Sequence, residues 1–297
     1  MMLYGILTAF ITGLCWTCIG IVLSCCASRK LAIVPYSFLQ NFLTGAIACF
    51  LIDFQKVNLR DFFILASFIF VAGFLNSLGQ MMVHNAMKRG DHAPIWAISQ
   101  SALIFPFLVG IIFFHNSGTA GQWFGTMLIV AGILIPQTKE IRNISGWFIS
   151  ALTAFFIFGL VQTLYNIPSQ LCNSMDMAGA RPLSAICGST IGWLMIAGYS
   201  RTSLHFDRNT LLVACIMALV QLGALRMFFV SLDALAAVNC GNIAFPLMTG
   251  ANISAFAAYS IFIRKEKTSL LDKIGFCVVM AGLLFISLSV PSHTSLK

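Results

Sequence analysis

Ten long apolar stretches, separated by short polar loops, make up nearly all of this chain. Most of them approach the ~20 residues that a helix needs to cross the hydrocarbon core of a bilayer. Continuous apolar runs such as Phe62–Phe74 lack the alternating polarity of a membrane-spanning strand. The pattern therefore predicts an all-α membrane protein with ten transmembrane helices, at about residues 3–25, 31–52, 62–87, 93–114, 121–137, 146–167, 180–199, 210–233, 236–263 and 272–290.

Composition agrees with this pattern and limits the possible functions. Hydrophobic residues are 59% of the 297, charged residues only 9%, and the mean hydropathy is +0.92, which lies outside the range of soluble globular proteins. Loops of a few residues leave no room for a soluble catalytic or nucleic-acid-binding domain. There is also no Gly-rich loop ending in Lys-Ser or Lys-Thr that would bind ATP phosphates. We therefore expect the bundle itself to carry the function, without a cofactor, a metal or a nucleic-acid partner.

Lys and Arg are unevenly distributed between the two sides of the predicted bundle, and they form no continuous basic patch. One side holds twelve of them: Arg29, Lys30, Lys88, Arg89, Lys139, Arg142, Arg201, Arg208, Arg264, Lys265, Lys267 and Lys273. The other side holds four: Lys56, Arg60, Arg181 and Lys297. The positive-inside rule places the richer side in the cytoplasm, so both termini are predicted to be non-cytoplasmic.

The fifth and tenth predicted spans are similar in sequence. A shift of 150 residues brings Gly125 onto Gly275 and Ala131-Gly132 onto Ala281-Gly282. The sequence Leu-Thr-Ala-Phe near the start of the first span also recurs near the start of the sixth, at a shift of 145. These matches indicate an internal repeat of five spans.

The repeat divides the chain into a first five-helix half, residues 1–140, and a second, residues 141–297. Because five is odd, the second half enters the membrane from the opposite side, as in the inverted repeats of many secondary transporters. Equivalent loops of the two halves carry opposite charge bias, which inversion requires. The sequence thus predicts two inverted five-helix repeats.

Arg226 is the one full charge that the sequence places well inside an apolar segment. An arginine at the centre of a membrane helix costs roughly 2.5 to 3.5 kcal/mol, so such residues usually face the bundle interior, a partner charge or a watery path. We therefore expect Arg226 to bind an anionic group of a solute or to hold neighbouring amides. Two other interpretations remain open: its long stem reaches the membrane interface, or it pairs with Asp233, two turns along the same face.

A polar stripe runs along the third predicted helix, where Asn76, Gln80 and His84 follow one another at intervals of four residues. These side chains either bond to neighbouring helices or line a solute path. An alignment of the third span on the eighth puts Gln80 at the position of Arg226, which favours the path. His84 is also the titratable side chain that could carry a coupling proton, because no carboxylate lies in the middle of a span.

Amides and aromatic rings in other spans complete the predicted binding chamber. An uncharged chamber of this kind suits a small polar solute that is neutral or zwitterionic. Pro94, Pro106 and Pro246 are expected to break or kink helices beside it. The further candidates for solute contact are Trp16, Gln40, Trp96, Gln100, Gln162, Tyr165, Asn242 and Asn252.

Two inverted five-span halves with short loops resemble the drug/metabolite transporter superfamily of the EamA type, over essentially the whole chain. The best local match is the end of the second half, with Glu266, Gly275 and Ala281-Gly282, whereas Asn116 replaces the acidic residue in the first half. The segment Arg264–Glu266 and the stretch Met227-Phe228-Phe229 are similar to the rhamnose-type sugar porters of that superfamily. The resemblance implies a transporter of the bacterial inner (plasma) membrane.

The function that we expect is secondary transport of a small polar metabolite, for which a sugar is one candidate, by alternating access to a central chamber. A broad exporter of amino acids or drugs and a membrane sensor that binds without flux remain alternatives. An enzyme is not expected, because the sequence has no H-E-x-x-H or G-x-S-x-G motif and no acid pair.

Overall fold

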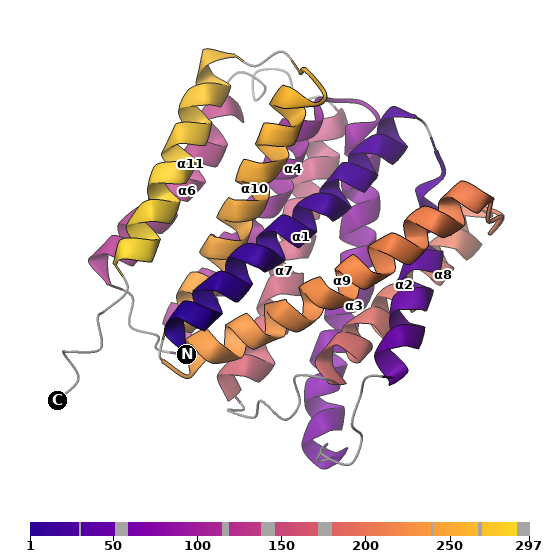
Figure 1. The fold of residues 1–297 in the computed structure, drawn as a ribbon, viewed down its shortest axis with the longest axis horizontal. Coiled ribbons are helices and arrows are strands. Elements are labelled where there is room, and N and C mark those ends of the chain that lie inside the picture. The colour runs from indigo at the N-terminus through magenta and orange to yellow at the C-terminus, as the bar shows by residue number, and fades with distance from the viewer. Residues whose placement is uncertain are drawn as a thin grey trace.

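The computed structural model describes residues 1–29, 31–50, 59–114, 119–137, 146–171, 180–238, 240–266 and 269–289. Every regular element within these ranges is a helix (Figure 1). In chain order the helices are α1 (Met2–Ser28), α2 (Ile33–Phe50), α3 (Leu59–Met87), α4 (His92–Gln100), the 3₁₀-helix η2 (Ser101–Leu103), α5 (Ile104–Ile112), α6 (Ala120–Gln137), α7 (Gly146–Leu171), α8 (Ala180–Ser200), α9 (Arg208–Ala236), the 3₁₀-helix η5 (Gly241–Ile243), α10 (Ala244–Phe262) and α11 (Leu270–Leu288).

The predicted apolar segments fall on these helices, and the fourth segment comprises α4, η2 and α5 in succession. The prediction that the chain is all-helical is confirmed for the described residues. Shorter apolar stretches lie in α6 and α11. As expected of an integral membrane protein, the described residues include seven helical stretches long and apolar enough to cross a membrane: Met2–Ser28, Ile33–Phe50, Ala66–Met87, His92–Ile112, Gly146–Gln170, Ala180–Ser200 and Arg208–Ala236.

The predicted boundary between the eighth and ninth segments, after residue 233, is wrong. Helix α9 continues to Ala236, and the next helical residues begin at Gly241. The prediction placed Asp233 at the end of the eighth segment. In the structure the Asp233 carboxylate is bound by the Arg181 guanidinium from α8, so the helix can continue past it.

Two prolines account for the breaks in the fourth and ninth segments. Pro106 and Pro246 each lie three residues after a 3₁₀-helix, at the third position of α5 and α10. A proline has no N–H for the carbonyl four residues earlier, and its ring clashes with that carbonyl. The carbonyls concerned belong to residues 102 and 242, inside η2 and η5, so the prediction that these prolines interrupt their helices is confirmed.

The helices form a bundle in which α1 packs beside α9 and α10, while α3 packs beside α7 and α8. Figure 1 shows α1 and α9 in front of α3 and α7, with α6 and α11 side by side at one edge. Helix α2 contacts α8 and α9. The space between the front and back helices is where the candidate site lies.

Glycines allow α3 and α8 to approach until their backbones touch. A Cβ atom on Gly188 would lie 2.0 Å from the carbonyl oxygen of Phe70, and one on Gly73 would lie 2.0 Å from that of Ala185. No larger residue fits either position unless the helices separate. Small residues at such contacts are typical of helix association in membranes.

The contact between α6 and α11 repeats itself along the two helices. A Cβ atom on Gly125 would lie 2.7 Å from the carbonyl oxygen of Gly282, and one on Gly132 would lie 2.6 Å from that of Gly275. These four glycines are the ones that the 150-residue shift relates in sequence. Gly125 therefore contacts the sequence equivalent of Gly132, and Gly132 contacts the sequence equivalent of Gly125.

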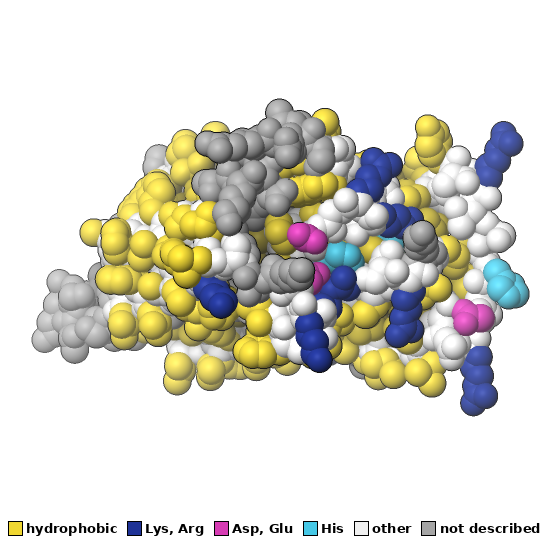
Figure 2. All heavy atoms as spheres, turned by 90° about the horizontal axis from the view of Figure 1, so that it is seen from above, with side chains coloured by type: hydrophobic (Ala, Val, Ile, Leu, Met, Phe, Trp, Pro, Cys, Tyr) yellow, Lys and Arg dark blue, Asp and Glu magenta, His cyan; other side chains and the backbone are white. Residues whose placement is uncertain are grey.

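Charged side chains gather at one end of the bundle. Figure 2 shows Lys and Arg, with Asp, Glu and His among them, over part of one face, while apolar side chains cover much of the rest. The described basic residues that follow α1, α3, α8 and α10 belong to loops that share one end in a bundle of successive antiparallel helices. This is the basic side that the sequence predicted.

Candidate solute-binding cavity

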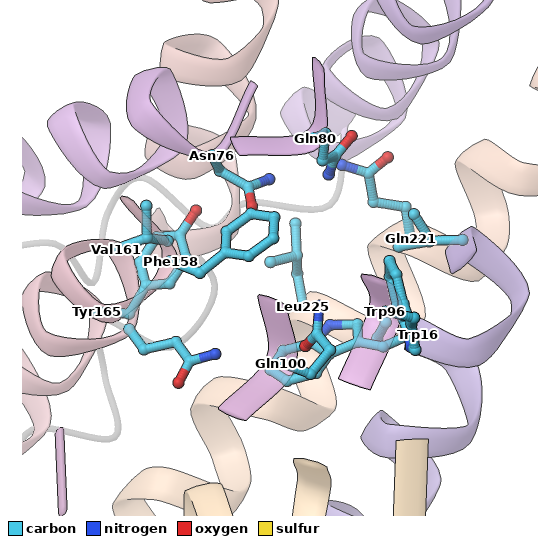
Figure 3. A pocket seen from close by; sticks show the side chains of 13 residues that line it. Trp16, Asn76, Gln80, Trp96, Gln100, Phe158, Val161, Tyr165, Gln221 and Leu225 are labelled. Atoms are coloured by element: carbon cyan, nitrogen blue, oxygen red, sulfur yellow. The ribbon is translucent and has the colours of Figure 1, made fainter. Parts of the chain in front are cut away.

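A cavity of about 90 Å³ lies between α1, α3, α4, α7 and α9 (Figure 3). Three of its residues, Trp16, Asn76 and Gln221, are within one turn of the middle of their helices. The cavity is therefore remote from the helix ends. It is lined by Trp16, Ile19, Asn76, Gln80, Trp96, Gln100, Phe158, Val161, Gln162, Tyr165, Gln221, Ala224 and Leu225.

The side chain of Asn252, on α10, holds two of the lining residues from behind. Its Oδ1 accepts hydrogen bonds from Trp96 Nε1 at 3.2 Å and from Thr17 Oγ1 at 3.2 Å. Its Nδ2 donates to Gln100 Oε1 at 3.3 Å. Asn252 is fully buried and does not line the cavity, so it positions the lining rather than contacting a solute.

A second amide group links the cavity to α2. Gln221 Nε2 donates to Asn41 Oδ1 at 3.0 Å, and its Oε1 accepts a hydrogen bond from Gln40 Nε2. Thr44 Oγ1 donates to the carbonyl of Ala218 at 3.5 Å, one turn along α9. Both polar ends of the Gln221 amide are thus occupied by α2.

Three other lining amides have no such partners. Asn76, Gln80 and Gln162 make no side-chain hydrogen bond to any residue that the structure describes. Figure 3 shows Asn76 and Gln80 on the side of the cavity opposite Gln100 and Trp16. Gln162 is only 6% exposed, and its Oε1 has no hydrogen-bond donor among the described residues. A buried amide without a partner is costly, which applies to Gln162, whereas Asn76 and Gln80 are half-buried. All three have polar groups available to bind a solute.

Aromatic rings form the rest of the wall and are packed against further rings. The ring centroids of Trp16 and Phe228 lie 5.4 Å apart, and those of Tyr165 and Phe228 lie 5.7 Å apart. Trp96 stacks on Phe256 at 5.3 Å. Contacts of this length restrict ring motion, so the apolar wall has a defined shape.

An ion pair lies beyond the aromatic side of the cavity, and the sequence did not predict it. Arg181 binds both carboxylate oxygens of Asp233 and donates to Ser169 Oγ at 2.8 Å. Its guanidinium carbon lies 4.9 Å from the centre of the Phe229 ring. Phe229 in turn packs on Tyr165, whose ring lines the cavity, at 5.8 Å. The pair joins α7, α8 and α9 at the end opposite the basic loops.

The expectation that Arg226 faces the bundle interior is wrong. Its side chain is exposed and does not line the cavity. Arg226 shares the face of α9 that carries Ile216 and Leu219, which are 55% and 63% exposed. Pairing with Asp233, one of the two other interpretations, is also wrong, because that carboxylate is bound by Arg181.

A one-residue error in the alignment of the two halves explains the misplacement of Arg226. Asn76 and Gln80 line the cavity from α3 at a spacing of four, and Gln221 and Leu225 line it from α9 at the same spacing. The shift between the two pairs is 145 residues, whereas the predicted match of Gln80 with Arg226 needed 146. One residue turns a side chain by about 100° around a helix, which is enough to move it from the cavity to the exposed face.

The structure brings seven of the twelve predicted contact residues to the cavity: Trp16, Asn76, Gln80, Trp96, Gln100, Gln162 and Tyr165. Gln40 and Asn252 lie behind its wall, where they bind lining residues. His84 is fully buried one turn beyond Gln80 and does not line the cavity. The side chain of Asn242 lies outside the described residues.

Six lining residues were missed by the sequence analysis. Gln221 could have been found, since it is an amide inside an apolar helix like the others that were chosen. The remaining ones, Ile19, Phe158, Val161, Ala224 and Leu225, are apolar and carry no signal that separates them from lipid-facing or core residues. Within the described part of the chain, no three His, Cys, Asp or Glu side chains come together as a potential metal site.

Comparisons with known proteins show the fold and leave the activity open. No protein-family model matches the chain. No curated protein matches it significantly either. A solved structure described only as "Crystal structure of protein" superposes with a TM-score of 0.66 at 11% sequence identity, covering 96% of this chain and 96% of that one. The chain is similar to that protein in fold over nearly its whole length.

Proposed function

We propose that this protein is a secondary transporter of a small polar metabolite, with the EamA-type architecture of the drug/metabolite transporter superfamily. The observation that carries the proposal is the mid-bundle cavity, lined from α1, α3 and α4 of the first predicted half and from α7 and α9 of the second. Transporter sites built from repeats lie at the repeat interface near the middle of the membrane. Relative movement of the halves would expose such a site to each side in turn.

Helix packing supports two inverted repeats as the basis of this movement. In chain order, the predicted repeat makes α1, α2, α3 and α6 of the first half equivalent to α7, α8, α9 and α11 of the second. Exchange of the halves then turns the contact of α1 with α9 into that of α7 with α3, and the contact of α2 with α9 into that of α8 with α3. The pair α6 and α11 maps onto itself. All of these contacts are present, as expected if a twofold axis relates the halves.

Two local features also repeat under this exchange. The contact of Gly125 with Gly282 becomes that of Gly275 with Gly132, and both contacts are present. The 3₁₀-helices η2 and η5 each precede a proline by three residues in the fourth and ninth spans. Broken helices beside a binding site are typical of secondary transporters, and Gln100, directly before η2, lines the cavity.

The size of the cavity favours a small metabolite over a drug. Pockets for drug-sized ligands have volumes of about 300 to 1,000 Å³, and this cavity has about 90 Å³. The hydrogen-bonded Gln100 and Gln221 and the packed rings also differ from the adaptable lining of a broad exporter. We place the basic loops in the cytoplasm and both termini outside, in a bacterial inner (plasma) membrane.

Proton coupling through His84 is part of the proposal. His84 lies one turn from Gln80 on α3 and is fully buried. Flux that rises with an inward proton gradient in the wild type, and no longer rises in His84→Gln, would support this role. Flux that does not depend on pH in the wild type would remove His84 from it.

The transport proposal is tested by uptake into proteoliposomes of a labelled panel of neutral sugars, polyols, amino acids and nucleosides. Wild type is compared with Asn76→Leu, which removes a lining amide, and with Asn209→Leu, an exposed control at the start of α9. We expect saturable flux of one solute class, at least tenfold lower in Asn76→Leu and unchanged in Asn209→Leu. Saturable binding without flux in correctly reconstituted protein would overturn transport and favour a sensor.

A further inference from the structure

The amides that line the cavity divide into two groups, and the division indicates what the solute must offer. Gln100 and Gln221 are held by side chains of α10 and α2. Asn76, Gln80 and Gln162 have no partner in the described part of the chain. We infer that the solute of this cavity is an uncharged, multiply hydroxylated molecule whose hydroxyl groups pair with these three amides. The inference rests on the proposed function and names its substrate class.

The cavity offers no counter-charge to an ionised solute. None of its lining residues is Asp, Glu, Lys, Arg or His. Arg181, beyond the aromatic wall, is bound to Asp233, and Arg226 is exposed on the far face of α9. A carboxylate or ammonium group in the cavity would lose its hydration without gaining an opposite charge. Organic acids, amines and zwitterionic amino acids are therefore disfavoured.

Hydroxyl groups complement primary amides in both directions. Each amide side chain offers two N–H donors and a carbonyl acceptor, and each hydroxyl both donates and accepts. Of the three amides, Gln162 has the strongest need for a hydrogen-bond donor on the solute, because its buried Oε1 has no donor among the described residues. A rotation of its terminal amide group would bring either polar end to the cavity that it lines. An apolar solute would leave all three amides unpaired.

The aromatic rings of the lining suit the C–H faces of such a solute. Trp16, Trp96, Phe158 and Tyr165 present rings to the cavity, and two of these rings are packed from behind by Phe228. Pockets that bind small molecules combine an apolar lining with a few polar groups that fix orientation. A lining that combines these rings with the three unpaired amides matches a compact polyol, with its hydroxyl groups toward Asn76, Gln80 and Gln162.

The test is isothermal titration of the full chain in nanodiscs with four-carbon solutes that differ in charge. Erythritol is neutral, erythronate is an anion, threoninol is a cation and threonine is a zwitterion; neutral pentitols and monosaccharides extend the series. We expect at least one neutral member to bind saturably and its charged analogues to bind at least tenfold more weakly. A charged member that binds as tightly as the neutral ones, or the absence of saturable binding by every neutral member, would overturn the inference.

Variants of Gln162 separate a binding role from a structural one. Gln162→Met removes the amide at similar length, and we expect it to weaken binding of the neutral solute at least tenfold. Gln162→Glu places a carboxylate in the wall, and we expect it to shift the preference from erythritol toward threoninol. Gln170→Met, two turns along α7 and outside the cavity lining, is the control and should bind as the wild type does.

Unchanged binding in Gln162→Met, or an unchanged order of preference in Gln162→Glu, would overturn the role of this residue. Asn76→Leu, at a half-buried position, makes the same measurement if Gln162→Met does not fold. Failure of the transport proposal would give a different result from failure of this inference. Neutral solutes would then bind without flux, whereas flux of a charged solute would overturn the inference and leave transport standing.

Discussion

Removal of the Asp233 carboxylate should destabilise the protein more than any other loss of a described ion-pair partner. Arg181 and Asp233 have side chains only 4% and 9% exposed, and the guanidinium is bound to both carboxylate oxygens. Loss of one partner of a buried pair leaves the other charge without compensation and typically costs about 3 to 5 kcal/mol. Ser169 and the Phe229 ring would still contact Arg181. We therefore expect Asp233→Ala to lower the free energy of unfolding by about 3 kcal/mol.

The assay is SDS titration of the purified protein in mixed micelles, with the free energy of unfolding as the readout. The control is Glu266→Ala, which removes the partner of Arg264 in a pair that is 23% and 18% exposed. Pairs near the surface contribute about 0 to 1 kcal/mol, and this pair is more exposed than Arg181 and Asp233, so the variant should change little. The double variant Arg181→Met with Asp233→Leu replaces both charges by apolar groups and should recover most of the loss.

Two results would refute this reasoning. The first is an Asp233→Ala variant within about 1 kcal/mol of the wild type, the range expected of an exposed pair. The second is a double variant as unstable as Asp233→Ala, because the cost would then come from packing rather than from the unpaired Arg181 charge.

Three further predictions follow from contacts described above. Gly188→Ala should lower the melting temperature, because the new Cβ would clash with the α3 backbone. Gly198→Ala should not lower it, because no atom lies within 4 Å of the new Cβ. Equal melting temperatures of the two variants would contradict the close packing of α3 and α8. Asn252→Leu should weaken solute binding at least tenfold by releasing Trp96 and Gln100, and binding equal to that of the wild type would argue against this positioning role. Arg226→Ala should keep solute flux within about twofold of the wild type because the side chain is exposed. Loss of flux in this variant would show that Arg226 contributes to transport.

The apolar pattern was sufficient to predict the helices, because a membrane leaves little choice of backbone structure. A segment in lipid must satisfy its own N–H and C=O groups, so long apolar runs become helices almost regardless of detail. The boundary near Asp233 was the exception. There α9 continues to Ala236, and Asp233 is bound by Arg181, about fifty residues earlier in the chain, a contact that no local pattern contains.

The candidate cavity was predicted in part, for a related reason. Amides inside apolar helices are rare enough to be noticed, so Asn76, Gln80 and Gln162 could be chosen from the sequence. Which amide faces the cavity and which lies behind it depends on the rotation of each helix and on partners from distant segments. Asn252 and Gln162 look alike in sequence, yet one holds the wall and the other is part of it.

The two cavity indoles give this protein an intrinsic optical reporter. The chain has five tryptophans, and of these Trp16 and Trp96 line the cavity. Their emission depends on the polarity of the space beside them, so a solute that displaces water there should alter the fluorescence without any attached label. Substitution of phenylalanine at residues 123, 147 and 193 would leave a protein whose emission comes from the cavity alone.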